Sequence, residues 1–225
     1  MLIKDHIVKS YDDELNRLIS MILDMGHLVE SQLEKVLESL TQGNAVLAQE
    51  VIDGDLEINH LENKIDTGAV RLLALRQPVA SDLRNVVAAL KISVNLERMA
   101  DYAVNVAKRA IQLNHMGPIQ YISPITRLVR LVQEMIRDVL KAYTQLDDEA
   151  AFEIWGRDKE VDELYNSFVR ELLTYMMEDP RNISPCIHIL FIAKNIERIG
   201  DHVTNIAEHI HYLVKGTLWS ESREE

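Results

Sequence analysis

The sequence predicts an all-α protein, built from two antiparallel three-helix bundles that pack side by side with pseudo-twofold symmetry. Apolar residues recur at alternating steps of three and four along most of the chain, which is the spacing of amphipathic helices. Eight glycines, five prolines and 5% aromatic residues are too few for a turn-rich all-β sandwich. The second half of the chain also repeats polar positions of the first half at a nearly fixed offset.

The repeat is clearest in five polar positions that occur twice, one hundred residues apart. The matched residues are Asn95 and Asn195, Glu97 and Glu197, Arg98 and Arg198, Asp101 and Asp201, and Asn105 and Asn205. Upstream, polar positions in residues 41–61 match those in residues 144–164 at an offset of 103. We therefore expect one three-helix repeat in residues 1–115, a second in residues 123–216, and a tail in residues 217–225.

Turn residues mark the ends of the first three helices. The first helix is expected from about residue 5 to residue 42, because Gly43 follows its apolar stripe. A second helix with the same rhythm should stop before Pro78, since proline cannot continue a helix. Ser81 is the expected N-cap of a third helix that extends to about residue 114.

Turn residues mark the helix ends of the second repeat in the same way. A fourth helix should begin at Ser123, which is followed by proline. A fifth is expected over residues 147–178 and should end at Pro180. A sixth should open at Ser184, again followed by proline, and extend to residue 216.

Composition limits the function. The formal net charge of −12 argues against nucleic-acid binding and against direct attraction to anionic lipid. Cys186 is the only cysteine, so no intrachain disulfide forms, which fits a reducing compartment. The N-terminus has no signal-peptide pattern and no apolar run approaches the roughly 18 residues of a membrane span, so we expect a cytoplasmic protein. Because no phosphate loop, zinc-protease motif or nucleophile context occurs, we expect no enzyme.

The repeated acids are the candidate functional feature. Glu97 and Asp101 lie four residues apart, as do Glu197 and Asp201, so the members of each pair are about 40° apart on a helix. Like charges at this spacing destabilise a helix. The first pair interrupts an apolar stripe, whereas the second shares its sector with the charged Lys194.

Neighbouring helices provide partner residues. Asp55 and Asn59 lie on the second predicted helix, and Asp158 and Asp162 occupy the matching positions on the fifth. If these helices pack antiparallel against the third and sixth, each half brings three or four acidic groups together. Two unit charges 4 Å apart repel by about 4 kcal/mol at an effective dielectric of 20.

A metal ion or an arginine could resolve this repulsion. Oxygen ligands from Asp, Glu and Asn suit Mg, Ca, Mn or Fe better than Zn or Cu. Arg98 and Arg198 are the competing solution, because a guanidinium can neutralise a carboxylate. A third possibility is that the acids lie on solvated helix faces and have no neutralising partner. The candidate metal ligands are Asp55, Asn59, Glu97, Asp101, Asp158, Asp162, Glu197 and Asp201.

Four segments together resemble the PhoU family, the accessory regulators of bacterial phosphate-specific transport. They are Asn-Leu-Glu-Arg-Met-Ala-Asp at 95–101, Asn-Ile-Glu-Arg-Ile-Gly-Asp at 195–201, Arg-Gln-Pro-Val-Ala-Ser-Asp-Leu-Arg at 76–84 and Leu-Thr-Tyr-Met-Met-Glu-Asp at 173–179. The acid-x-x-x-Asp pairs are the signature of that family. Asn59 departs from it, because the family pattern has an acid there.

The resemblance implies a homodimer of spectrin-like bundles that binds iron at the acidic pairs, with manganese, magnesium or zinc as alternatives and no organic cofactor. It implies negative regulation of phosphate uptake and of the phosphate-starvation response. The family connects the ATPase of the phosphate ABC transporter to a sensor histidine kinase. Contact with the inner face of the membrane would come only through these partners, and no nucleic acid is expected.

Two other functions remain open from the residues alone. One is a metal-free helical adaptor, serving this or another phosphate carrier, in which Arg98 and Arg198 pair with the acids. The other is a di-iron carboxylate oxidase or iron-storage protein. Glu57 with His60, and Glu208 with His211, match the Glu-x-x-His step of di-iron bundles, although we interpret both as chance surface matches.

Overall fold

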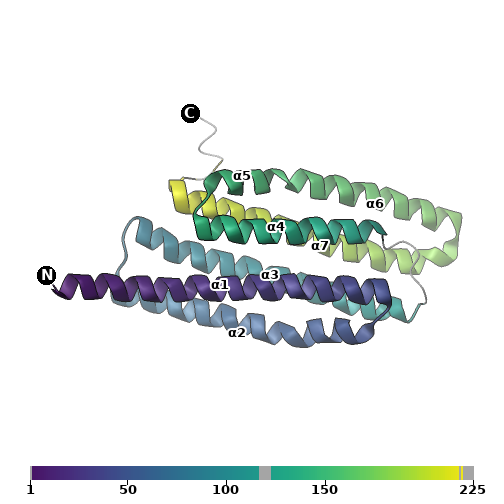
Figure 1. Cartoon of the computed structure of the whole chain (residues 1–225). Helices are drawn as coiled ribbons and strands as arrows, with labels where there is room; N and C mark the ends of the chain where they lie inside the picture. Colours follow the sequence, from purple (N-terminus) through teal and green to yellow (C-terminus); the bar gives the residue numbers. More distant parts are fainter. Residues whose placement is uncertain (1, 117–122, 218, 220–225) are drawn as a thin grey trace.

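The computed structural model describes residues 2–116, 123–217 and 219, and these form seven α-helices and one short 3-10 turn (Figure 1). In chain order the elements are α1 (Leu2–Gln42), α2 (Ala45–Arg76), α3 (Ser81–Asn114), α4 (Ser123–Gln145), α5 (Asp148–Gly156), α6 (Asp158–Glu178), η1 (Pro180–Asn182) and α7 (Ile183–Lys215). The predicted all-α class is confirmed.

The helices form two elongated bundles that lie side by side, as Figure 1 shows. Helices α1, α2 and α3 make the first bundle. In the second, α5 and α6 together take the place of one long helix beside α4 and α7. Helix α3 packs on α7 and α1 on α4, so these four helices form the interface between the bundles.

Helices α3 and α7 are central because each faces its own bundle and the other bundle. Small buried residues let neighbouring helices come close to both, including Ala103 and Ala107 in α3 and Ala193 in α7. At Gly200 of α7 a Cβ atom would lie 3.3 Å from Cγ1 of Val161 in α6. The glycine therefore allows α6 to approach α7 directly beside the second acidic pair.

The predicted fifth helix is not continuous. It breaks between α5 and α6, where Gly156 lowers helix propensity and the Arg157 amide bonds to the carbonyl of Ile154 at 3.0 Å, a 3-10 contact. The Arg157 guanidinium lies 2.9 Å from Asp138 and 3.2 Å from Glu134, both on α4. These ion pairs hold the junction on α4.

The predicted N-cap of the third helix is wrong by one residue. Ala80 takes that position with φ 49° and no side-chain cap, and Ser81 is already helical. Gln77 closes α2 in the left-handed region with φ 47°, which tightens the turn around Pro78. A backbone bond satisfies one of the amides that a side-chain cap would bind, since the Asp82 amide donates to the Val79 carbonyl at 3.1 Å.

Most of the expected tail lies outside the described residues, but Trp219 is described. Its ring centroid lies 5.6 Å from that of Phe152, 5.4 Å from that of Trp155 and 4.9 Å from that of His211. This contact ties the end of the described chain to α5 and α7.

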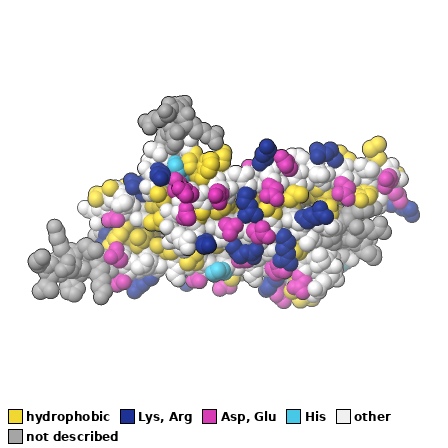
Figure 2. Space-filling model, turned by 45° about the horizontal axis from the view of Figure 1, so that its top comes forward, with side chains coloured by type: hydrophobic (Ala, Val, Ile, Leu, Met, Phe, Trp, Pro, Cys, Tyr) yellow, Lys and Arg dark blue, Asp and Glu magenta, His cyan; other side chains and the backbone are white. Residues whose placement is uncertain are grey.

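The surface mixes charges of both signs. Figure 2 shows Lys and Arg side chains interleaved with Asp and Glu side chains over one face of the molecule. Within the described part of the chain, no helix is both long enough and apolar enough to traverse a lipid bilayer.

Candidate metal centre

The first acidic site lies between α2 and α3. All four predicted residues, Asp55, Asn59, Glu97 and Asp101, are half-buried, and Nδ2 of Asn59 donates to Oδ2 of Asp55 at 3.0 Å. Burial is the main cause that raises the pKa of Asp55, and the Asp101 carboxylate on the facing helix adds to it. Burial and then Asp101 also raise the pKa of Glu97. The antiparallel packing therefore brings these carboxylates close enough to repel one another.

The second site repeats this arrangement between α6 and α7. Burial raises the pKa of Asp158, and the charges of Asp162 and Glu197 raise it further. Burial and then the charge of Asp158 raise the pKa of Asp201. Glu197 is buried, with 7% of the residue exposed, whereas Asp162 and Asp201 are more exposed, so the burial that acts on Asp201 is partial.

The relative burial of the two pairs differs from the expectation. The sequence predicted a more apolar setting for the first pair than for the second. In the structure, however, the Glu97 side chain is 22% exposed and the Glu197 side chain only 9%. Val94, in the sector of the first pair, is itself 46% exposed, so the apolar stripe there borders solvent. In the second repeat, the close approach of α6 at Gly200 accompanies the deeper burial of Glu197.

Each acid pair has a cationic neighbour, but the two repeats use different residues. Arg98 places Nη1 3.0 Å from Oδ2 of Asp101 and Nε 3.6 Å from Oε2 of Glu97, as the arginine hypothesis predicted. In the second repeat, Lys194 contacts the acids instead, with Nζ 2.6 Å from Oε1 of Glu197. Arg198 lies over the Tyr102 ring, 5.6 Å from its centroid.

Lys194 is the residue that sequence reasoning did not assign. Its signal was its position three residues before Glu197, a spacing at which helical side chains of opposite charge pair. Arg198 acts on its own acids only at longer range: its charge lowers the pKa of Asp201, against the larger effect of burial, while its guanidinium lies over the Tyr102 ring of α3.

The donor set fits a hard cation, although the side chains do not surround one in their present positions. Among the described residues, no three Asp, Glu, His or Cys side chains converge on a point that could hold a metal ion. All donors at both sites are carboxylate or amide oxygens, which suits Mg, Ca, Mn or Fe. To ligate a metal, the acids would have to exchange their contacts with Arg98 and Lys194.

The di-iron spacing motifs do not form sites. Glu57, His60 and Glu208 are exposed. His211 is buried, and its Nδ1 lies 2.6 Å from Oδ1 of Asp148 on α5, so a different carboxylate is its partner.

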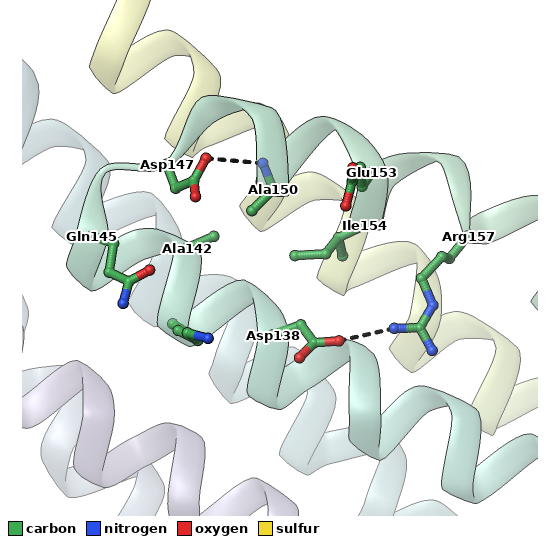
Figure 3. Close-up of a pocket in the computed structure, with 9 residues that line it drawn as sticks. Asp138, Ala142, Gln145, Asp147, Ala150, Glu153, Ile154 and Arg157 are labelled. Atoms are coloured by element: carbon green, nitrogen blue, oxygen red, sulfur yellow. Dashed lines mark hydrogen bonds and ion pairs between the residues drawn. The ribbon is translucent and has the colours of Figure 1, made fainter.

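A separate pocket of about 290 Å³ lies between α4 and α5 (Figure 3). None of the eight candidate ligands lines it. Asp138 on its rim is paired with Arg157, and Asp147 caps α5 by accepting from the Ala150 amide at 3.0 Å. These contacts engage Asp138, Asp147 and Arg157, and the charged residues Lys141 and Glu153 also line the pocket.

We expect Asp55→Asn to stabilise chelator-treated protein by about 0.2–0.5 kcal/mol at pH 7, by removing one like-charge contact. The folded-state pKa of Asp55 is raised, so its ionised form destabilises the fold above that pKa. This cost disappears as the pH falls through the folded pKa towards the unfolded value. Urea unfolding should therefore show a smaller gain from the substitution at pH 4 than at pH 7.

Asp53→Asn is the matched control, because Asp53 is exposed on the same helix. It should leave the free energy of unfolding nearly unchanged at both pH values. A loss of stability on Asp55→Asn at pH 7 would contradict the proposed repulsion.

The fold and the duplicated acids define a class of two-repeat helical proteins that carry one acid pair on each repeat. A family model described as PhoU domain matches residues 22–110, within α1–α3, and residues 125–210, within α4–α7. The chain belongs to the PhoU family, and the resemblance inferred from its motifs is confirmed.

Relatives match over nearly the whole chain. The phosphate-specific transport system accessory protein PhoU homolog of Caulobacter vibrioides (strain NA1000 / CB15N) is 50% identical over 94% of this chain and 93% of its own length. The protein of the same name from Xylella fastidiosa (strain 9a5c) is 46% identical over 98% and 93%.

Solved structures share the fold. The crystal structure of PhoU from Pseudomonas aeruginosa superposes with a TM-score of 0.87 at 43% identity, covering 92% of this chain and 100% of that one. The phosphate transport system regulatory protein PhoU from Streptococcus pneumoniae gives a TM-score of 0.86 at 30% identity, covering 92% and 98%.

Proposed function

We propose that this chain is an accessory regulator of phosphate transport, which represses phosphate uptake and the phosphate-starvation response when phosphate is plentiful. The proposal is carried by near-full-length relatives at 50% and 46% identity that are named as accessory proteins of the phosphate-specific transport system. In this role the protein works in the cytoplasm and couples the ATPase of the phosphate ABC transporter to a sensor histidine kinase at the inner face of the membrane.

The architecture suits an adaptor. Two similar bundles lie side by side and present two related faces, so the same kind of surface can engage two partners or a second copy in a homodimer (Figure 1). The net charge of −12 favours partners with basic docking surfaces.

Metal binding at the acid pairs is the second part of the proposal. Asp55, Asn59, Glu97 and Asp101 would hold one site between α2 and α3; Asp158, Asp162, Glu197 and Asp201 would hold the other between α6 and α7. A divalent or trivalent cation, iron or else manganese, magnesium or zinc, supplies positive charge there. The acids, once neutralised, would hold their helices together and stabilise the docked or dimeric form.

Deletion of the gene should leave the phosphate-starvation response active in phosphate-rich medium, because the kinase no longer receives the signal of a satisfied transporter. A transcriptional reporter of that response and the uptake of radiolabelled phosphate measure the effect. Complementation with the intact gene should restore repression. Normal repression in the deletion strain would contradict the regulatory role.

A metal-free adaptor is the second candidate, and the contacts of Arg98 and Lys194 with the acids favour it. Protein purified without chelator and containing far fewer metal ions than chains would support this candidate. Oxygen- or peroxide-dependent turnover by the iron-loaded protein would instead support an oxidase, and inactivity in both assays would remove that alternative.

A further inference from the structure

The two repeats keep the same acids but neutralise them differently. In the first repeat Arg98 contacts both Glu97 and Asp101, at 3.6 and 3.0 Å. In the second, Lys194 takes over the contact with Glu197. The residue that matches Lys194 in the first repeat is Val94, so the first repeat has no lysine at that position. The charge of Lys108 acts on Asp55 and lowers its pKa, against the larger effect of burial.

The arginine of the second repeat shows where a displaced guanidinium can go. Arg198 on α7 lies over the ring of Tyr102 on α3, with 5.6 Å between its Cζ atom and the ring centroid. Pseudo-twofold symmetry exchanges Arg198 with Arg98 and Tyr102 with His202, both at an offset of one hundred. The corresponding position for Arg98 is therefore the imidazole face of His202 on α7.

His202 is positioned to receive a guanidinium. Its ring centroid lies 5.6 Å from that of Tyr102, and its Nδ1 lies 2.8 Å from Oδ1 of Asn95, which fixes the ring in the interface between α3 and α7. The planar guanidinium of an arginine can stack on an aromatic face such as this ring.

Arg98 and a metal cation compete for the same two carboxylates, because their own positive charges repel each other. The Arg98 side chain is 55% exposed, and exposed ion pairs contribute little, so leaving the acids costs little. Its long side chain allows the guanidinium to turn while the backbone stays in place.

We propose that Arg98 is a counter-ion with two positions: it pairs with Glu97 and Asp101 until those acids ligate a metal ion, and then stacks on His202 at the α3–α7 interface. The inference rests on the metal-binding part of the proposed function and deepens it. Occupancy of the first site is thereby linked to the contact between the two bundles, and Arg98 sets the affinity of that site.

Titration of the full, chelator-treated chain with Mn²⁺ tests the competition, with free Mn²⁺ counted by electron paramagnetic resonance. Arg98→Gln should bind Mn²⁺ at the first site roughly three- to tenfold more tightly than the unsubstituted chain. This range corresponds to the free energy of an exposed ion pair plus some repulsion between the guanidinium and the metal ion. Arg198→Gln removes the same charge at the matched position. Because Arg198 already lies on Tyr102, we expect a change below about twofold there.

His202→Tyr tests the second position. The new tyrosine copies Tyr102, so it should hold Arg98 away from the acids. In the chain that keeps Arg98, Mn²⁺ should therefore bind several-fold more tightly. In the Arg98→Gln background it should have no effect, since the two changes act through one guanidinium. An equal effect of His202→Tyr in both backgrounds would overturn the stacked position.

Unchanged or weaker Mn²⁺ binding by Arg98→Gln, with clear binding by the unsubstituted chain, would overturn the counter-ion role and leave the metal site standing. Absence of Mn²⁺ binding in every variant would overturn the metal site and this inference together.

Discussion

Replacing Glu197 and Asp201 together by alanine is expected to remove the metal from the second site of the purified protein. These residues are the α7 half of the site, and Glu197 is its most buried carboxylate. Losing a residue that only supports a metal ligand typically costs about 10–100-fold in affinity, and the loss of two direct ligands should exceed that. Inductively coupled plasma mass spectrometry of protein prepared without chelator measures the metal content per chain.

The matched control replaces Glu163 on α6 and Glu208 on α7, two exposed acids on the same helices, so the net charge changes equally. This control should retain its metal. Replacing Glu97 and Asp101 should remove the other site while sparing the second. Circular dichroism would verify that each variant is folded, and a metal content unchanged by Glu197→Ala with Asp201→Ala would reject those ligands.

The helices could be predicted because helical periodicity and turn residues are local signals. Gly43, Pro78 and Gly216 lie where helices end, as expected. The break at Arg157 could not be predicted in the same way. Gly156 is a local signal, but Gly54 and Gly68 lie inside the continuous α2, so glycine alone does not predict a break. The ion pairs of Arg157 with Asp138 and Glu134 form only after α4 has packed against the α5–α6 junction.

The facing carboxylates could also be predicted, since the repeat implied antiparallel neighbours and a four-residue spacing fixes one helical face. The side chain that neutralises each acid pair could not be predicted from the sequence. Arg98 and Arg198 occupy equivalent positions in sequence, yet Arg198 has a tyrosine ring across the bundle interface and a lysine three residues before Glu197 that takes its place. Such competition depends on rotamers and on residues far away in the chain.

The burial of Glu197 shows how packing overrides a helical-wheel argument. Its sector contains charged residues, which suggested a solvated face, but Gly200 lets α6 come close and Val161 packs there. Burial raises the pKa of Glu197, so its charged form, 7% exposed beside Asp158 and Asp201, is stabilised by a positive partner. Lys194 supplies that partner in the described arrangement, and exchange with a metal ion would preserve the charge balance.

Leu96→Ala should lower the free energy of unfolding by about 2–5 kcal/mol, because it opens a cavity at a fully buried position. Leu96 lies in α3 between Asn95 and Glu97, in the helix that joins both bundles. Urea or thermal unfolding of chelator-treated protein measures the loss. A loss below about 1 kcal/mol would mean that the core around α3 closes over the cavity.

Val94→Ala is the matched control two residues away, since Val94 is 46% exposed, and it should change stability by less than about 0.5 kcal/mol. Saturating Mn²⁺ should stabilise Leu96→Ala and the unsubstituted chain by similar amounts. Ligand binding raises the free energy of unfolding by an amount that depends on the free Mn²⁺ concentration and the affinity. If Mn²⁺ stabilises the Leu96 variant much less than the unsubstituted chain, core packing and the acid pair of α3 are coupled. The rigid apolar face of α3 would then be part of what positions Glu97 and Asp101 opposite Asp55.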